Sequence, residues 1–96
     1  MVTGETKSLL IKLEAAGNCV LGYVCFQEVA PGQVDKTEEV EPGLVMADYD
    51  ADGRLLGVEF LDAERADSSL MRRLAERLNA PELAGIDLCQ MCKTPV

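Results

Sequence analysis

The sequence contains no histidine, which removes the commonest general base of enzymes at neutral pH and a frequent metal ligand. It also lacks a phosphate-binding P-loop, a dinucleotide-binding glycine fingerprint and a serine–histidine pair. We identify no catalytic and no cofactor-binding residues, and we expect no cofactor. The sequence therefore leans towards a protein that is not an enzyme.

Basic residues are few: the sequence has nine Lys and Arg and 17 Asp and Glu, which gives a formal net charge of −8. Such a surface repels the phosphates of nucleic acids and of anionic lipids, so we expect neither a nucleic acid nor a membrane as partner. The charge suits a basic protein partner, although solubility alone also accounts for it.

Long apolar runs are absent, and none approaches the roughly 20 residues that a membrane-spanning helix requires. Residues 1–7 lack the basic and apolar regions of a signal peptide, and we expect them to be flexible. The expectation is a soluble cytoplasmic protein in which the four cysteines are reduced thiols.

The 96 residues suffice for a single domain, and 48% of them are hydrophobic, as in ordinary globular chains. Between residues 8 and 62, segments whose side chains alternate with a period of two are separated by turn-forming residues. This pattern predicts the strands 8–13, 19–26, 37–40, 44–49 and 55–62. In the last strand, alternation separates two groups: Leu56, Val58 and Phe60 on one face, and Leu55, Gly57, Glu59 and Leu61 on the other.

A helical period follows over residues 67–79, where leucines recur at positions 70, 74 and 78. An Asp or Ser at positions 67–69 can cap this helix, and Pro81 bars its continuation. The tail, residues 86–96, has no clear pattern. The predicted fold class is α+β: an antiparallel β-meander of four to five strands (8–62) with one C-terminal amphipathic helix packed on one sheet face.

Several of the predicted strands are apolar on both faces, whereas a single helix covers only one face of a sheet. A second copy of the sheet is the simplest cover for the other face. We therefore expect a homodimer.

An acidic stretch fits the calcium-loop template D-x-[DN]-x-[DN]-G-x5-E, with Asp48, Asp50, Asp52 and Glu59 at the ligand positions. That site needs a helix on each side, whereas the flanking residues 43–47 and 56–60 favour strands. A hairpin is the better interpretation. Asp50 and Asp52 then form the turn, and Gly53 takes its left-handed position.

The same region resembles a known family. Residues 37–43 (TEEVEPG) and 48–63 (DYDADGRLLGVEFLDA) are similar to the signature T-E-E-V…D-Y-D-x-x-G-x-x-x-G-I-E-I-L-D-A of the domain-of-unknown-function 2283 family, small bacterial proteins. Residues 13–21 depart from the hairpin with which members usually begin. The resemblance implies a small β-rich fold with a helix, and it brings no established activity or site residues.

Cys89 and Cys92 form a lone Cys-x-x-Cys, for which plain thiols, a zinc or other soft-metal site and a redox pair are all open. Cys19 and Cys25 lie about 20 Å apart on one predicted strand face, too far to bind one metal together. Two functional hypotheses result. The first is a non-enzymatic homodimeric interaction module that binds a basic protein, and the second is a thiol- or metal-dependent activity at Cys89 and Cys92.

Overall fold

The computed structural model describes residues 9–26 and 32–93. The N-terminal segment 1–7, for which the sequence predicts flexibility, lies outside the described residues. So do residues 27–31 of the predicted loop and the last three residues of the tail. Within the described part of the chain, no helix is long and apolar enough to span a bilayer.

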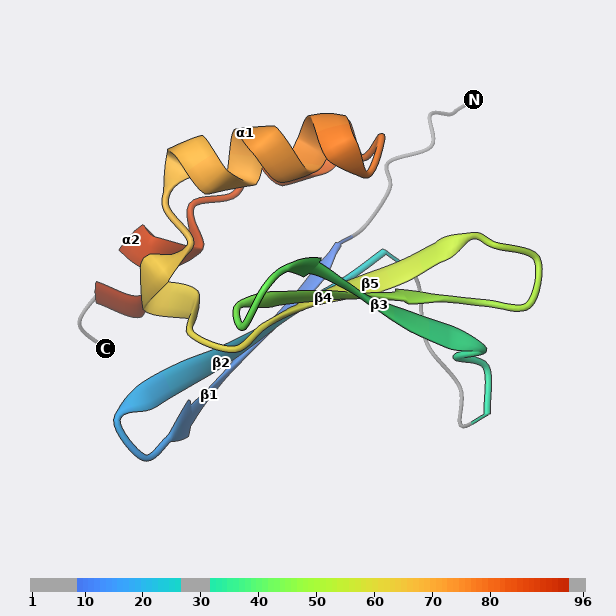
Figure 1. The fold of residues 1–96 in the computed structure, drawn as a ribbon. Coiled ribbons are helices and arrows are strands. Elements are labelled where there is room, and N and C mark those ends of the chain that lie inside the picture. Colours follow the sequence, from blue (N-terminus) through green and yellow to red (C-terminus); the bar gives the residue numbers. More distant parts are fainter. Residues whose placement is uncertain (1–8, 27–31, 94–96) are drawn as a thin grey trace, which may run out of the picture.

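In the described ranges, five antiparallel strands form one sheet in the order β1-β2-β5-β4-β3 (Figure 1). The hairpin β1–β2 and the meander β3–β4–β5 are joined because β2 pairs with β5. The α+β class predicted from the sequence is confirmed. The strands are β1 (Leu10–Ala16), β2 (Cys19–Cys25), β3 (Lys36–Glu41), β4 (Val45–Tyr49) and β5 (Leu55–Phe60).

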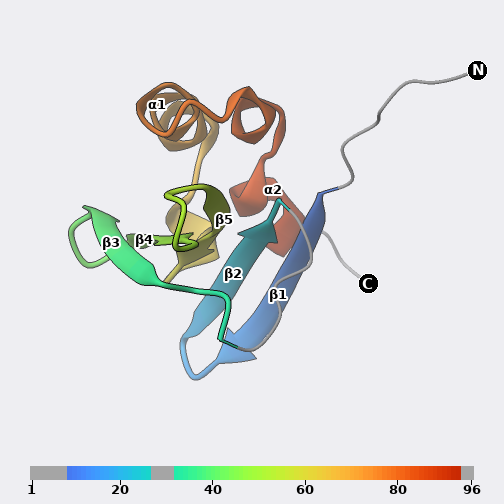
Figure 2. The same ribbon diagram turned by 90° about the vertical axis from the view of Figure 1, so that its right-hand side faces the viewer.

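The predicted helix 67–79 is α1 (Ser68–Arg77), which lies over one face of the sheet (Figures 1 and 2). Its cap is Asp67, whose side chain accepts a hydrogen bond from the backbone N–H of Leu70 at 2.9 Å. Two 3-10 helices, η1 (Ala63–Arg65) and η2 (Pro81–Gly85), flank it.

The tail adds a second helix, α2 (Leu88–Lys93), which the sequence pattern does not predict. Leu88 is fully buried in the core, and Asp87 accepts a hydrogen bond from the backbone N–H of Gln90 at 3.0 Å. One buried leucine and one capping carboxylate therefore hold a segment that is too short to show a helical period of its own.

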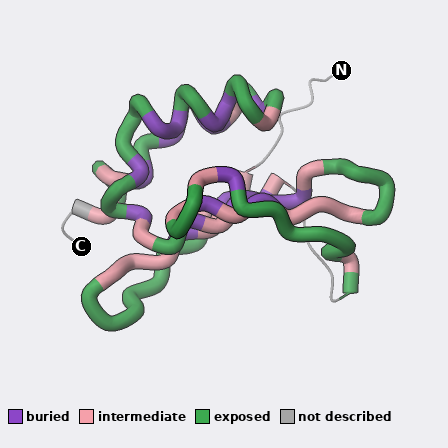
Figure 3. Tube along the Cα trace, viewed as in Figure 1, coloured by how far each residue is buried: buried purple, intermediate pink, exposed green. Residues whose placement is uncertain are grey.

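The hydrophobic core lies between α1 and the sheet (Figure 3). Val24, Val58 and Phe60 of the sheet and Met71 and Leu74 of α1 are fully buried. Burial of each such side chain stabilises the fold by about 1.5–3 kcal/mol relative to exposure. The apolar side chains of α1 that recur with the 3.6-residue period are the ones that pack in this core.

The pairing of β4 with β5 contains a register shift. Asp48 lies opposite Gly57 and Tyr49 lies opposite Leu55, which leaves Leu56 as the extra residue of a bulge. Leu55 therefore packs against the core, whereas Leu56 is buried outside the main core cluster. The simple alternation predicted for this strand is wrong at Leu55, because a bulge reverses the side-chain parity beyond it.

The turn between β4 and β5 is built on Asp50. Its Oδ1 accepts hydrogen bonds from the backbone N–H groups of Asp52 and Arg54, both at 2.9 Å. Gly53 has a φ of +82° and donates its N–H to the carbonyl of Asp50 at 3.0 Å. Strands flank this turn on both sides, whereas a calcium loop needs helices, and Glu59 lies in β5 opposite Met46.

Replacing Gly53 with Ala is expected to lower the free energy of unfolding by about 1 kcal/mol, because a side chain disfavours positive φ. No atom lies within 4 Å of the new Cβ, so a steric clash does not contribute. Gly85→Ala is the matched control, since its space is also open and its φ is not positive. Urea unfolding measures both variants, and an equal loss in each would contradict this account.

Candidate functional site

The sheet face opposite the helices is not covered by any described helix (Figures 1 and 2). Residues directly opposite each other in antiparallel strands share a face, so the pairing register assigns its members. We call this surface the open face. It carries Leu10, Lys12, Glu14, Ala16, Cys19, Leu21, Tyr23, Cys25, Thr37, Glu39, Met46, Asp48, Gly57 and Glu59.

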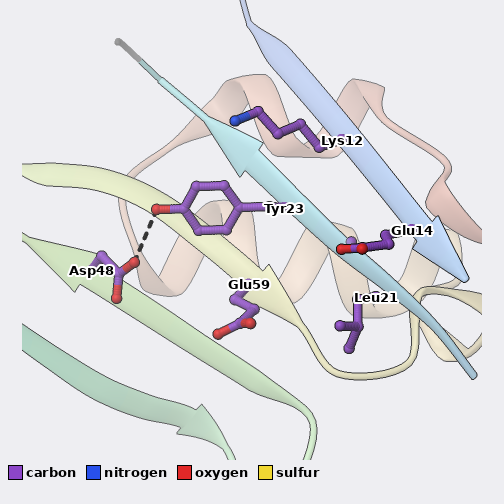
Figure 4. Close-up of a pocket in the computed structure, with 7 residues that line it drawn as sticks. Lys12, Glu14, Leu21, Tyr23, Asp48 and Glu59 are labelled. Atoms are coloured by element: carbon purple, nitrogen blue, oxygen red, sulfur yellow. Dashed lines mark hydrogen bonds between the residues drawn. The ribbon is translucent and has the colours of Figure 1, made fainter. Parts of the chain in front are cut away.

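A shallow hollow of about 340 Å³ lies in the open face where β1, β2, β5 and β4 run side by side (Figure 4). Three carboxylates and one ammonium group surround a tyrosine ring and a leucine there. The lining residues are Lys12, Glu14, Leu21, Gly22, Tyr23, Asp48 and Glu59.

Tyr23 reaches from β2 across β5 to Asp48 on β4, and its hydroxyl donates a hydrogen bond to Asp48 Oδ2 at 2.9 Å (Figure 4). The ring passes over Gly57 on the intervening strand. A Cβ at that position would lie 2.5 Å from the tyrosine oxygen and 2.7 Å from its Cζ. Residue 57 must therefore be glycine for the ring to take this course.

Asp48 joins three strands through its two carboxylate oxygens. The Thr37 hydroxyl of β3 donates to Oδ1 at 2.7 Å, and the Tyr23 hydroxyl of β2 donates to Oδ2. Hydrogen bonds to an ionised acceptor are stronger than those between neutral groups. The carboxylate on β4 thereby fixes two side chains at the surface without a covering layer.

Burial raises the pKa of the Tyr23 hydroxyl, and the hydrogen bond to Asp48 and the negative charges of Asp48 and Glu59 raise it further. The hydroxyl is therefore a neutral hydrogen-bond donor at physiological pH and does not serve as an acid or base there. Glu59 is half-buried beside the ring, and within the described residues it has no hydrogen bond or ion pair.

The tail cysteines lie on α2, three residues apart, and both are half-buried. Cys92 packs against the core, where burial and then the charge of Glu64 raise the pKa of its thiol. A raised pKa favours the neutral thiol over the thiolate, which is the nucleophile and the metal ligand.

The strand cysteines do not join them. Cys19 and Cys25 lie on the open face, on the other side of the sheet from the core that Cys92 contacts, and burial raises the pKa of the Cys25 thiol. In the part of the chain that the structure describes, no three or more residues of the types His, Cys, Asp and Glu come together as a metal site would require.

The two-residue alternation of a strand places Tyr23 on the same face as Cys19, Leu21 and Cys25, but it does not reveal the contact with Asp48. Gly57 is the signal that points to it, since a glycine inside a strand often marks the close approach of another group. The turn residues Asp50, Asp52 and Gly53 lie at the end of the β4–β5 hairpin, away from the hollow.

Fold and site together define a small α+β domain with helices on one sheet face and a polar open face built around a tyrosine–aspartate bond. Residues 23–64 match the model of a family described as protein of unknown function (DUF2283). This match confirms the resemblance drawn from the sequence. The matched segment supplies Tyr23, Asp48, Gly57 and Glu59, whereas β1 precedes it. No curated protein and no solved structure matches the chain.

Gly57→Ala is expected to lower the free energy of unfolding by about 1–3 kcal/mol, because the added methyl group displaces the Tyr23 ring. In a Tyr23→Ala background the same substitution should cost less, since the ring is absent. A double-mutant cycle from urea unfolding measures the difference, with an expected coupling of about 1 kcal/mol or more. Additive effects would show that the ring and the glycine do not interact.

Tyr23→Phe should reduce stability at neutral pH by about 1 kcal/mol through loss of the bond to Asp48. Folding raises the pKa of Tyr23 above its ordinary value of 10.0, so the stabilisation is complete below pH 10 and is lost as the pH rises further. The wild-type protein should therefore lose stability more steeply above pH 10 than the phenylalanine variant. Urea unfolding across this range tests it, and parallel profiles would contradict the prediction.

Proposed function

We propose that the protein is a non-enzymatic interaction module whose open face binds a basic segment of a partner protein. The observation that carries this proposal is the charge of the open face. Among the described residues, the open face carries one ammonium group, that of Lys12, and four carboxylates: Glu14, Glu39, Asp48 and Glu59. A basic partner offsets the excess of negative charge and is steered towards it from a distance.

The hollow has the chemistry that an arginine or lysine side chain requires. Glu59 projects into it and has no partner among the described residues, while Leu21 offers apolar surface for a methylene stem (Figure 4). A guanidinium group donates in a planar fork that matches a carboxylate. Asp48 is already occupied by Tyr23 and Thr37, which leaves Glu59 as the acceptor for an incoming cation.

The alternative hypothesis, a thiol- or metal-dependent activity at Cys89 and Cys92, has no comparable support. The raised pKa of the Cys92 thiol disfavours the thiolate that either chemistry needs. A cytoplasmic location is part of the proposal, since all four cysteines are free thiols, as is usual in a reducing compartment.

Glu59→Lys is expected to weaken the binding of a short, unstructured peptide rich in Lys and Arg by about tenfold at low salt, because it reverses the charge in the hollow. Isothermal titration calorimetry measures the affinity. Glu76→Lys makes the same charge change on the exposed side of α1 and serves as the control.

The control variant should weaken binding by about twofold or less, because screening reduces the effect of a distant charge. Equal losses in the two variants would mean that the peptide responds to net charge alone, and the open face would then not be the binding surface.

A further inference from the structure

The two edges of the sheet differ in their protection against strand addition. β3 pairs irregularly with β4, with a register shift between Glu39 and Glu41, and it carries three glutamates in six residues. Bulges and repeated like charges keep an edge from pairing with another chain. β1 has neither. All seven of its residues pair in register with β2, and only Lys12 and Glu14 are charged.

The outer backbone groups of β1 are fixed by its hairpin. A two-residue turn joins β1 to β2, so the closing pair of Ala16 with Cys19 is hydrogen-bonded. Hydrogen-bonded and non-hydrogen-bonded pairs alternate along an antiparallel ladder. The N–H and C=O groups of every second residue therefore point away from β2, namely those of Ile11, Leu13 and Ala15.

We propose that β1 pairs antiparallel with β1 of a second copy of this chain, with the twofold axis at Leu13. In this register Leu13 exchanges hydrogen bonds with the partner's Leu13, and Ile11 exchanges them with the partner's Ala15. The outward groups of all three residues are thereby satisfied, and the two sheets become one.

Charge selects this register over its neighbours. It places Lys12 opposite the partner's Glu14, and Glu14 opposite the partner's Lys12, in non-hydrogen-bonded pairs, where the side chains are closest. An axis at Lys12 would set the two lysines against each other, and an axis at Glu14 would oppose the two glutamates. Only the axis at Leu13 forms two pairs of opposite charge.

The same pairing covers apolar surface that one copy leaves exposed. Leu13 is 39% exposed and Leu10 is 54% exposed. In the dimer Leu13 meets its own copy on the helix side, and Leu10 faces the partner's Ala16 on the open face. A dimer that stacks open faces, as the sequence alone suggests, would instead oppose two surfaces of net negative charge.

The edge dimer also extends the open face, since a twofold axis perpendicular to the sheet leaves both open faces on the same side. Two acidic hollows then flank one axis. The dimer itself does not depend on the proposed function, and its test needs no peptide.

Sedimentation equilibrium of the purified full chain measures the dimer directly. The wild-type protein should be a dimer. Lys12→Glu and Glu14→Lys should each raise the dissociation constant of the dimer by about tenfold or more, because residues 12 and 14 of the two copies then carry the same charge at both symmetry-related positions. The double variant Lys12→Glu/Glu14→Lys restores opposite charges and should dimerise as the wild type does. An equimolar mixture of the two single variants should form a heterodimer.

Lys36→Glu makes the same charge change on the opposite edge and should leave the dimer intact. Circular dichroism checks the folding of each variant. Leu13→Pro provides a second route to a monomer if a charge variant does not fold, because it removes an outward N–H that β2 does not use. A monomeric wild-type protein would overturn the proposal, and so would single variants or a Leu13→Pro variant that dimerise as strongly as the wild type.

Discussion

The open face depends on the hydrogen bond from Tyr23 to Asp48, made across Gly57. It links β2 to β4 over the central strand β5, and Thr37 of β3 binds the other oxygen of the same carboxylate. These side-chain bonds connect β2, β4 and β3 across β5, in addition to the backbone pairing that sets the order of the strands. This arrangement keeps the exposed side of the sheet ordered while the helices and the apolar core lie on the other side.

The same bond decides what the face can do. The Tyr23 hydroxyl is committed to donating and its pKa is raised, so this hydroxyl does not serve as an acid or base at neutral pH. Three acidic side chains line the hollow around it, and Glu59 makes no hydrogen bond or ion pair with another described residue. A surface of this kind is suited to recognition. The unprotected edge at β1 is the surface for the proposed self-association, and it meets the open face at Lys12 and Glu14, which belong to both.

Local features of the fold were predictable, because each depends on neighbouring residues. The period of α1, the cap at Asp67 and the strands on either side of Gly53 are examples. Features that depend on distant residues were not predictable. The pairing of β2 with β5 joins two strands that are separated in the sequence by β3 and β4. The bulge at Leu56 arises from the fit of β4 to β5. The hydrogen bond from Tyr23 to Asp48 spans 25 positions, and only Gly57 marks it in the sequence.

The most direct test of the open face as a binding surface is chemical-shift mapping. Backbone amide signals of isotopically labelled protein are followed as a basic peptide is added. The account predicts changes concentrated at Tyr23, Asp48 and Glu59 and at their neighbours on β1, with α1 unaffected. Changes centred on α1, or spread evenly over both sides of the molecule, would contradict it.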